Sequence, residues 1–401
     1  MSNILLPAIW LIVMIVGLPQ LSETVYTPSL PDIAKSLSTS ASMTEYTLTI
    51  YLFAFALGTL FWGKLSDKFG RKPCVIAGLV IFLLGCIGCY FATSIEMLMV
   101  SRFIQAWGGS IGSVLGQAIS RDAYHGPRLG KVYATIGSAL AVFPAIGPVI
   151  GGAIAQQFGW RSIFLFLILF SVVLIVLIAM RLPETHLKED RRSIAIVEVI
   201  RRLLRDKKVL CFGFIVGGCN GISFSYFAEG AFYLIEGLGL SPSQYGLSFM
   251  MIAAASMMGG LVSKKCHDHV ASETIMKYGL LVILCSAGLF SLGAFFYPSI
   301  WVTILCQMSI MFGITMATSN ALASALKEYK DCIGTASSLF GFYYYILISA
   351  FTFGMGWLHN GSLLMMPLYF LGIGLAMMLV GKWGNRSLPQ DHKTKNSSPT
   401  L

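Results

Sequence analysis

The chain has 401 residues, of which 56% are hydrophobic and 11% are charged, and its mean hydropathy is +0.75. About 25% of residues are charged in a soluble domain, so this composition excludes a soluble protein and predicts an integral membrane protein. The net charge is +10, but no basic stripe is paired with aromatic stacking residues, so we expect no nucleic-acid partner.

Apolar runs separated by charged or turn-rich breaks predict an all-α fold with twelve membrane-spanning helices. About 20 apolar residues are needed to cross the hydrocarbon core of a bilayer. The predicted spans are 4–25, 43–62, 74–93, 96–119, 132–156, 161–181, 209–235, 244–263, 276–297, 300–326, 333–357 and 363–383. The first run has no basic segment before it and no small-residue cleavage site, so we interpret it as a retained helix rather than a signal peptide.

The segment 63–73, GKLSDKFGRKP, joins the second and third spans. Five of its eleven residues are charged, while the two flanking spans contain Glu45 as their single charge. A short charged segment between two apolar runs predicts a loop at the membrane surface.

The longest polar break, 182–208, divides the chain into two halves. We predict a six-helix bundle over 1–181, a cytoplasmic linker over 182–208, a second six-helix bundle over 209–383 and a cytoplasmic tail over 384–401. Within the linker, Ile196, Ile200, Leu203 and Leu204 recur at roughly helical spacing beside basic residues. This pattern indicates a linker helix, and the same helix could also lie on an anionic leaflet.

The distribution of Lys and Arg predicts the orientation in the membrane. Lys35 and Arg161 fall in loops on one side and Arg102 falls inside a span, whereas all other Lys and Arg residues fall on the other side. Cytoplasmic loops are enriched in Lys and Arg. Both termini are therefore predicted to be cytoplasmic.

The cysteines and histidines give no metal prediction. Cys86 and Cys89 form a CxxC inside the third span, where buried small hydrophobic residues are the expected interpretation. The stretch Cys266 to His269 has donor atoms suited to a metal, but no second ligand cluster follows at the spacing of a zinc site. We interpret it as a solvated loop and predict no metal.

Three ionisable residues are predicted at bilayer depth, namely Glu23, Arg102 and Glu229. An uncompensated charge at that depth costs about 3 kcal/mol or more, so each is a candidate functional residue. Glu23 ends the first span, just before Thr24. It is either a proton-binding residue or a glutamate solvated at the outer surface.

Glu229 lies in an aromatic segment that contains Tyr226, Phe227 and Tyr233. Aromatic faces beside a carboxylate suit lipophilic cations, although the same aromatic residues could form an interfacial belt. Other polar residues of the spans that could line a cavity are Gln105, Gln117, Asn220 and Asn320.

Three motifs carry a resemblance to a known family. The segment 63–73 resembles the signature between helices 2 and 3 of the major facilitator superfamily, and RFIQAWGGS at 102–110 looks like that superfamily's second motif. AIGPVIGG at 145–152 resembles the glycine–proline motif that marks antiporters. In the first signature the matching residues are Gly63, Leu65, Asp67, Gly70, Arg71 and Lys72.

Further segments extend the resemblance over nearly the whole chain. These are YTPSLPDIA (26–34), RDAY (121–124), WRSIF (160–164), LPET (182–185) and GTASSL (334–339). Together they resemble the drug:proton antiporters of the bicyclomycin/chloramphenicol-resistance type. Two departures stand out: relatives often have an aspartate where this chain has Thr24, and Lys264 stands where the repeated signature would have an aspartate.

The resemblance implies the major facilitator fold, with two six-helix bundles in a bacterial inner membrane, and a monomer. It implies export of small amphipathic or cationic compounds by alternating access in exchange for protons, with no cofactor beyond the proton gradient. A specific metabolite exporter or a proton symporter is the alternative. An enzyme is not expected, because no Ser/His/Asp set, metal cluster or phosphate loop is evident.

The candidate site residues fall into four groups. The proton-coupling residues are Glu23 and Arg102. The substrate-binding residues are Glu229, Tyr226, Phe227, Tyr233, Gln105, Asn220 and Asn320. The conformational latch is Gly63, Asp67, Gly70 and Arg71, in which Asp67 is expected to meet a helix N-terminus of the other half when the cytoplasmic face is closed. The antiporter motif is Gly147, Pro148, Gly151 and Gly152, whose small residues suit helix sliding.

Overall fold

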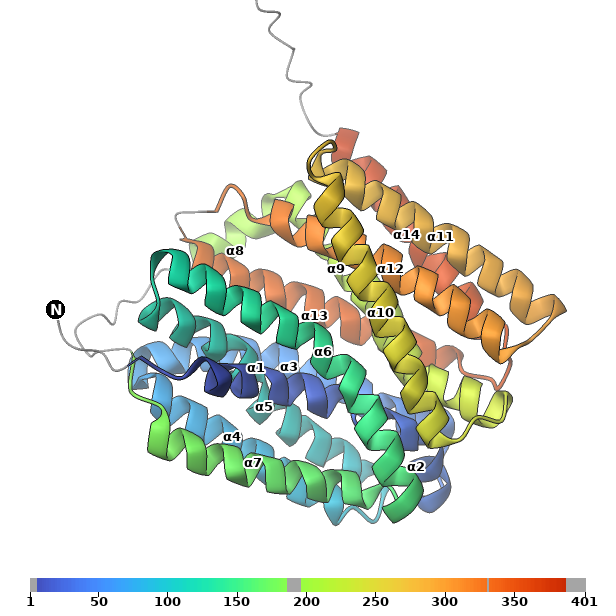
Figure 1. Cartoon of the computed structure of the whole chain (residues 1–401), viewed down its shortest axis with the longest axis horizontal. Coiled ribbons are helices and arrows are strands. Elements are labelled where there is room, and N and C mark those ends of the chain that lie inside the picture. The colour runs from blue at the N-terminus through green and yellow to red at the C-terminus, as the bar shows by residue number, and fades with distance from the viewer. Residues whose placement is uncertain (1–5, 186–195, 330–331, 387–401) are drawn as a thin grey trace, which may run out of the picture.

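A computed structural model describes residues 6–185, 196–329 and 332–386, and all regular structure in them is helical (Figure 1). The first part contains α1 (Ile9–Thr24), η1 (Thr27–Ser29), α2 (Leu30–Ser36), α3 (Ala41–Phe69), α4 (Arg71–Tyr90), α5 (Ile95–Ala123), α6 (Gly126–Phe158) and α7 (Arg161–Arg181). The second part contains α8 (Ile196–Arg205), α9 (Lys207–Ala231), η3 (Phe232–Gly237), α10 (Pro242–Cys266), α11 (Ser272–Phe296), α12 (Ile300–Ala325), α13 (Ile333–Leu358) and α14 (Met365–Arg386).

Eleven helices in the described residues are long and apolar enough to cross a membrane, and they correspond to eleven of the twelve predicted spans. The first of them continues through η1 and α2 to Ser36. The remaining predicted span, 96–119, corresponds to α5, which has 29 residues but carries Arg102 and Gln105 in its first half. Both side chains are fully buried against other helices. Because this polar face does not meet lipid, α5 can be less apolar than its neighbours.

The sequence predicted a loop over the charged segment 63–73, and this prediction is wrong. Helix α3 continues to Phe69 and α4 begins at Arg71, so Gly70 alone separates them, with φ of +103°. A left-handed φ is accessible to glycine without steric cost. The charged residues remain helical because the helix pairs its own backbone N–H and C=O groups while the charged side chains reach water. The carboxylate of Glu184 accepts hydrogen bonds from the backbone N–H groups of Arg71 (2.8 Å) and Lys72 (3.1 Å) and caps α4.

The linker region contains a helix that packs on the second part of the chain. Val199 and Leu203 of α8 are buried, and α8 contacts α9 and α13. The guanidinium of Arg202 lies 4.3 Å from the ring centroid of Tyr329. Asp206 accepts hydrogen bonds from the first N–H groups of α9, so the second half begins slightly earlier than predicted. The tail predicted from 384 lies largely outside the described residues.

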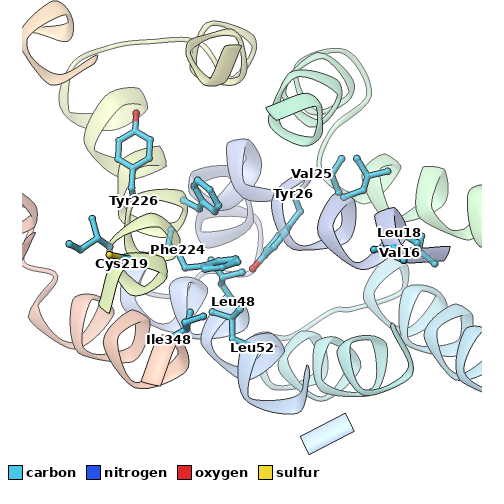
Figure 2. Close-up of a cluster of buried hydrophobic side chains, with 14 of the residues drawn as sticks. Val16, Leu18, Val25, Tyr26, Leu48, Leu52, Cys219, Phe224, Tyr226 and Ile348 are labelled. Carbon is cyan, nitrogen blue, oxygen red and sulfur yellow. The ribbon is translucent and has the colours of Figure 1, made fainter. Parts of the chain in front are cut away.

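Helices from both parts of the chain build one buried cluster (Figure 2). Tyr26, Leu48 and Leu52 come from the first part, and Phe224 and Ile348 come from the second. The two parts meet where α3 packs on α13 and where α6 packs on α10. These two contacts position the residues of the site.

The ends of the molecule differ. We call the end that carries Gly70 and α8 the α8 end, and the opposite end, which carries α2, the α2 end (Figure 1). At the α2 end, the rings of Tyr46 on α3 and Phe353 on α13 stack with centroids 4.9 Å apart. Lys35 of α2 forms an ion pair of 3.0 Å with Glu236 of η3. The α2 end is therefore closed.

Close packing of α4 on α5 depends on Gly108, and we expect Gly108→Ala to destabilise the protein by about 1–3 kcal/mol. A Cβ at this position would lie 2.4 Å from the backbone nitrogen of Phe82 and 2.5 Å from the carbonyl oxygen of Gly78. Thermal unfolding in detergent measures the effect. Gly288→Ala is the matched control, because a Cβ there meets no atom within 4 Å. Equal unfolding temperatures for both variants would contradict this role of Gly108.

Candidate functional site

A cavity of about 770 Å³ lies at the α8 end. Its walls come from α3 and α5 of the first part and from α8 and α13 of the second. Exposed Lys64 and Asp67 in its wall show that it is open to solvent. Phe61, Tyr344 and Tyr345 contribute aromatic side chains to the lining. The molecule is thus open at the α8 end and closed at the α2 end.

The predicted latch residue Arg71 forms a complete ion-pair cluster in the cavity wall. Its guanidinium donates to Asp67 at 2.6 Å, to Asp122 at 2.8 Å and to Ser66 Oγ at 2.7 Å. Asp67 therefore pairs within its own part of the chain. Its expected contact with a helix N-terminus of the other half stays a prediction, and the cavity lies beside Asp67 between α3 and α13.

Arg102 is fully buried on α5 and lies between two aromatic rings. Its Cζ is 4.0 Å from the ring centroid of Tyr26 and 4.2 Å from that of Tyr51. The guanidinium donates hydrogen bonds to the Ser22 carbonyl oxygen at 3.4 Å and to Gln105 Oε1. Its Nε and Nη2 have no hydrogen-bond partner in the described part of the chain.

Glu23 is 1% exposed, and neither carboxylate oxygen accepts a hydrogen bond from a described residue. The alternative of a glutamate solvated at the outer surface is therefore wrong. Glu23 follows Ser22, whose carbonyl oxygen accepts a hydrogen bond from Arg102. The carboxylate of Glu23 itself forms no ion pair with Arg102 within 4 Å in the described part of the chain. A buried polar group without a partner needs an explanation, and a role in binding a proton or an ion is one of them.

An aromatic wall separates Arg102 from the cavity. Tyr345, which lines the cavity, lies 4.7 Å from the ring of Phe55, measured between centroids. Phe55 lies 6.4 Å from Tyr51, whose other neighbour is Arg102. A rearrangement of these three rings would connect the open cavity to the buried charges.

The seven residues predicted to bind substrate lie elsewhere. None of them is among the described residues that line the cavity. Gln105 holds Arg102, Asn220 donates to the carbonyl oxygen of Val216 on its own helix, and Asn320 donates to Ser263 Oγ at 2.8 Å. Their role in substrate binding stays a prediction.

The aromatic residues around Glu229 are buried inside the protein and do not form an interfacial belt. Tyr226 is fully buried, and Phe227 and Tyr233 are 7% and 3% exposed. Tyr226 and Phe227 pack on Phe249, with centroids 5.8 and 5.4 Å apart. They stabilise the closed α2 end in this conformation.

Glu229 itself lies in a cluster that sequence analysis missed. Its Oε2 is 2.7 Å from Nδ1 of His359, and the same nitrogen is 3.4 Å from Oε1 of Glu45. The hydrogen bond to Glu229 raises the pKa of His359. Glu45 was visible only as a single charge in the span 43–62, and His359 directly follows α13.

The antiporter motif lies where α6 meets α1 and α10. A Cβ on Gly147 or Gly151 would collide with Thr24 Oγ1 or with the Val25 carbonyl oxygen, and a Cβ on Gly152 would lie 2.3 Å from the Pro242 carbonyl oxygen. These glycines allow backbones to approach closely, and they do so at the closed end.

Comparisons with known proteins agree with this architecture. Residues 10–352 match the family model described as Major Facilitator Superfamily. An uncharacterized transporter of Rickettsia felis is 36% identical, with 88% of this chain and 90% of that protein covered. A bicyclomycin resistance protein homolog of Haemophilus influenzae is 30% identical, with 81% and 82% covered.

A chloramphenicol resistance protein of Pseudomonas aeruginosa is 27% identical, with 80% of this chain and 77% of that protein covered. The named relatives confirm the resemblance to the bicyclomycin/chloramphenicol-resistance type. A bacterial homolog of the human lysosomal transporter Spinster, solved in an inward-facing and occupied conformation, superposes with a TM-score of 0.77 at 13% identity, and 95% of this chain and 96% of that chain are covered.

Replacing Arg102 by lysine is expected to lower stability by about 1–2 kcal/mol. Lysine keeps the charge but lacks the planar group that stacks on Tyr26 and Tyr51. Thermal unfolding in detergent measures the loss. Arg161→Lys is the control, since Arg161 is less buried and lies over one ring, Trp160. A wild-type unfolding temperature for Arg102→Lys would show that the planar stack contributes nothing.

Proposed function

The chain belongs to the major facilitator superfamily, and we propose that it is a proton-coupled efflux transporter that exports small amphipathic or cationic drugs by alternating access. Membership places it among membrane transporters rather than enzymes. The observation that carries the proposal is Glu23, a buried carboxylate without a partner that lies behind an aromatic wall from a solvent-open cavity. Relatives named for bicyclomycin, chloramphenicol and multidrug resistance support efflux.

We propose that α5 is the twelfth span and that residues 1–181 and 209–383 form two six-helix bundles in a bacterial inner membrane. Lys35 and Arg161 are the basic residues of the α2 end among the described residues, whereas the α8 end carries many. The enrichment of Lys and Arg in cytoplasmic loops supports a cytoplasmic α8 end, with both termini on that side. The protein would act as a monomer.

In this orientation, the cavity faces the cytoplasm and offers substrates an entrance. Its aromatic side chains suit apolar rings and, through their faces, cations. The same wall carries charges of both signs, with the carboxylates of Asp67 and Asp122 beside the cations of Lys64, Arg71 and Arg121. The lining therefore fits amphipathic compounds better than strongly polar metabolites.

We propose that Glu23 binds the coupled proton. An ionised carboxylate without hydrogen bonds in an apolar site is very costly, so Glu23 holds a proton while the wall of Tyr345, Phe55 and Tyr51 is closed. A substrate that displaces this wall would open Glu23 to the cavity and favour proton release, assisted by the cation of Arg102, and a cationic substrate would add its own charge to this effect. Such competition couples the two ligands.

The proton gradient is large enough for this task. Entry of one proton releases about 2.3 kcal/mol per 100 mV of membrane potential and about 1.4 kcal/mol per pH unit. One proton can therefore sustain an outward drug gradient of the order of a hundredfold.

Asp67→Asn is expected to lower drug export at least tenfold while expression stays normal. The substitution removes the latch charge without removing volume, so the α8 end can no longer form its closed contacts. Resistance and drug accumulation in an efflux-deficient strain measure the effect. Asp32→Asn, at an exposed position on α2, is the matched control. Near-wild-type export by Asp67→Asn would rule out the latch role.

Glu23→Gln is expected to abolish proton release on substrate addition, because glutamine mimics permanent protonation. Release from purified protein in detergent is measured with a pH indicator, using one cationic and one neutral compound. Glu229→Gln should keep release with the neutral compound, because the predicted role of that glutamate is to attract cationic compounds rather than to bind the coupled proton. The reverse result would assign the coupled proton to Glu229, and proton uptake rather than release would favour a symporter.

A further inference from the structure

A second set of ionisable side chains meets at the α2 end, away from the cavity. It consists of Glu45 on the first turns of α3, Glu229 near the end of α9 and His359 directly after α13. Their ligand atoms, one from each residue, all lie within 4.8 Å of one another. Proton coupling as proposed above does not use these residues.

Glu45 has an unexplained environment. The residue is fully buried, yet neither carboxylate oxygen accepts a hydrogen bond from a described residue, and its nearest cationic atom is Nδ1 of His359 at 3.4 Å. Glu229 is 4% exposed, and its one ion-pair partner among the described residues is the same nitrogen at 2.7 Å. One imidazole cannot neutralise two buried carboxylates. When both carboxylates are ionised, the cluster keeps a net negative charge even if the imidazole is protonated.

We propose that Glu45, Glu229 and His359 bind a divalent transition-metal ion of the zinc type at the α2 end. An ion with two positive charges balances two carboxylates while imidazole binds in its neutral form. Zn²⁺ accepts one histidine nitrogen and two carboxylate oxygens at about 2.0–2.2 Å, in sites that keep a fourth position for water. Imidazole disfavours Mg²⁺ and Ca²⁺, which prefer oxygen ligands.

The observed geometry is close to that of such a site. Tetrahedral ligands at these bond lengths lie about 3.4 Å apart, and the two distances from Nδ1 of His359 are 3.4 and 2.7 Å. To admit the ion, the distance between His359 and Glu229 must widen from 2.7 Å, so the ion replaces their hydrogen bond. The ring of Phe232 packs edge-on against the imidazole, with centroids 5.5 Å apart, and holds its orientation.

The ion has a route from outside the protein. The side chain of His359 is 16% exposed, whereas those of Glu45 and Glu229 are 0% and 5% exposed. The neighbouring ion pair of Lys35 with Glu236 lies at the same end, with side chains that are 70% and 39% exposed. His359 is therefore the ligand that an ion from outside would meet first.

Binding would connect the two parts of the chain. Glu45 belongs to the first part, and Glu229 and His359 belong to the second. An ion shared among them would hold α3 against α9 and α13 and keep the α2 end closed. The metal would thus favour the conformation whose cavity is open at the α8 end and would oppose the other conformation.

Zn²⁺ binding to purified protein tests the site directly. Protein freed of its affinity tag and stripped with a chelator is titrated with Zn²⁺ alone, and bound metal is counted after dialysis. We expect one high-affinity ion per chain, unaffected by excess Mg²⁺, and at least tenfold weaker binding in Glu45→Gln, Glu229→Gln and His359→Gln. Glu236→Gln and His267→Gln are controls that should bind as wild type does. Binding should weaken as pH falls, because protons compete for the ligands.

X-ray absorption at the zinc edge identifies the ligands in wild-type protein, so this second test does not depend on whether the variants fold. Wild-type protein should show one nitrogen and oxygen ligands near 2.0–2.1 Å and no sulfur at about 2.3 Å. A sulfur ligand would assign the ion to a cysteine site elsewhere and overturn the proposal, as would binding that is unchanged in Glu45→Gln. Wild-type protein that binds no Zn²⁺ would show that protons alone neutralise the two carboxylates. None of these measurements requires transport, so failure of efflux and failure of the metal site are distinguishable.

Discussion

The absence of water in the bilayer core is the constraint on which this structure depends, because each polar group there must find its partner inside the protein. Helix α5 shows the consequence. Arg102 and Gln105 lie in its first half, and both are removed from lipid by packing against α1, α3 and α4. The stacking of Arg102 between Tyr26 and Tyr51 supplies the π-faces that replace water around a buried cation.

Polar groups at the two ends satisfy this constraint to different degrees. Arg71 at the α8 end is surrounded by two carboxylates and a hydroxyl, so its cluster is fully paired even though the cavity beside it is open. Glu23 and Glu45 have no hydrogen bonds from described residues. A paired cluster stabilises one conformation, whereas an unpaired buried carboxylate is stabilised only when it binds a cation, a proton or a substrate. The unpaired groups therefore mark the places where ligands would act.

The two ends differ in how closely the two parts of the chain approach each other in this conformation. At the α2 end, Gly152 and Gly246 allow α6 and α10 to touch through their backbones. At the α8 end, the larger side chains of Phe61, Tyr344 and Tyr345 line a cavity instead. A change between the two conformations would tilt the same helices about the region where α3 packs on α13, with the buried charges near the centre of the motion.

The sequence by itself determined the membrane class, nearly all helix positions and the family, and it predicted roles for Arg102 and Glu23, because hydropathy, charge and motif spacing are local properties. It could not determine that residues 63–69 stay helical, since a charged segment at the water boundary fits either a loop or a helix end. Only the tertiary structure decided which partners each charge has. Glu229 and His359 are 130 residues apart, and Glu45 reaches them from the other part of the chain. No local pattern encodes a contact between three helices, since packing alone brings them together.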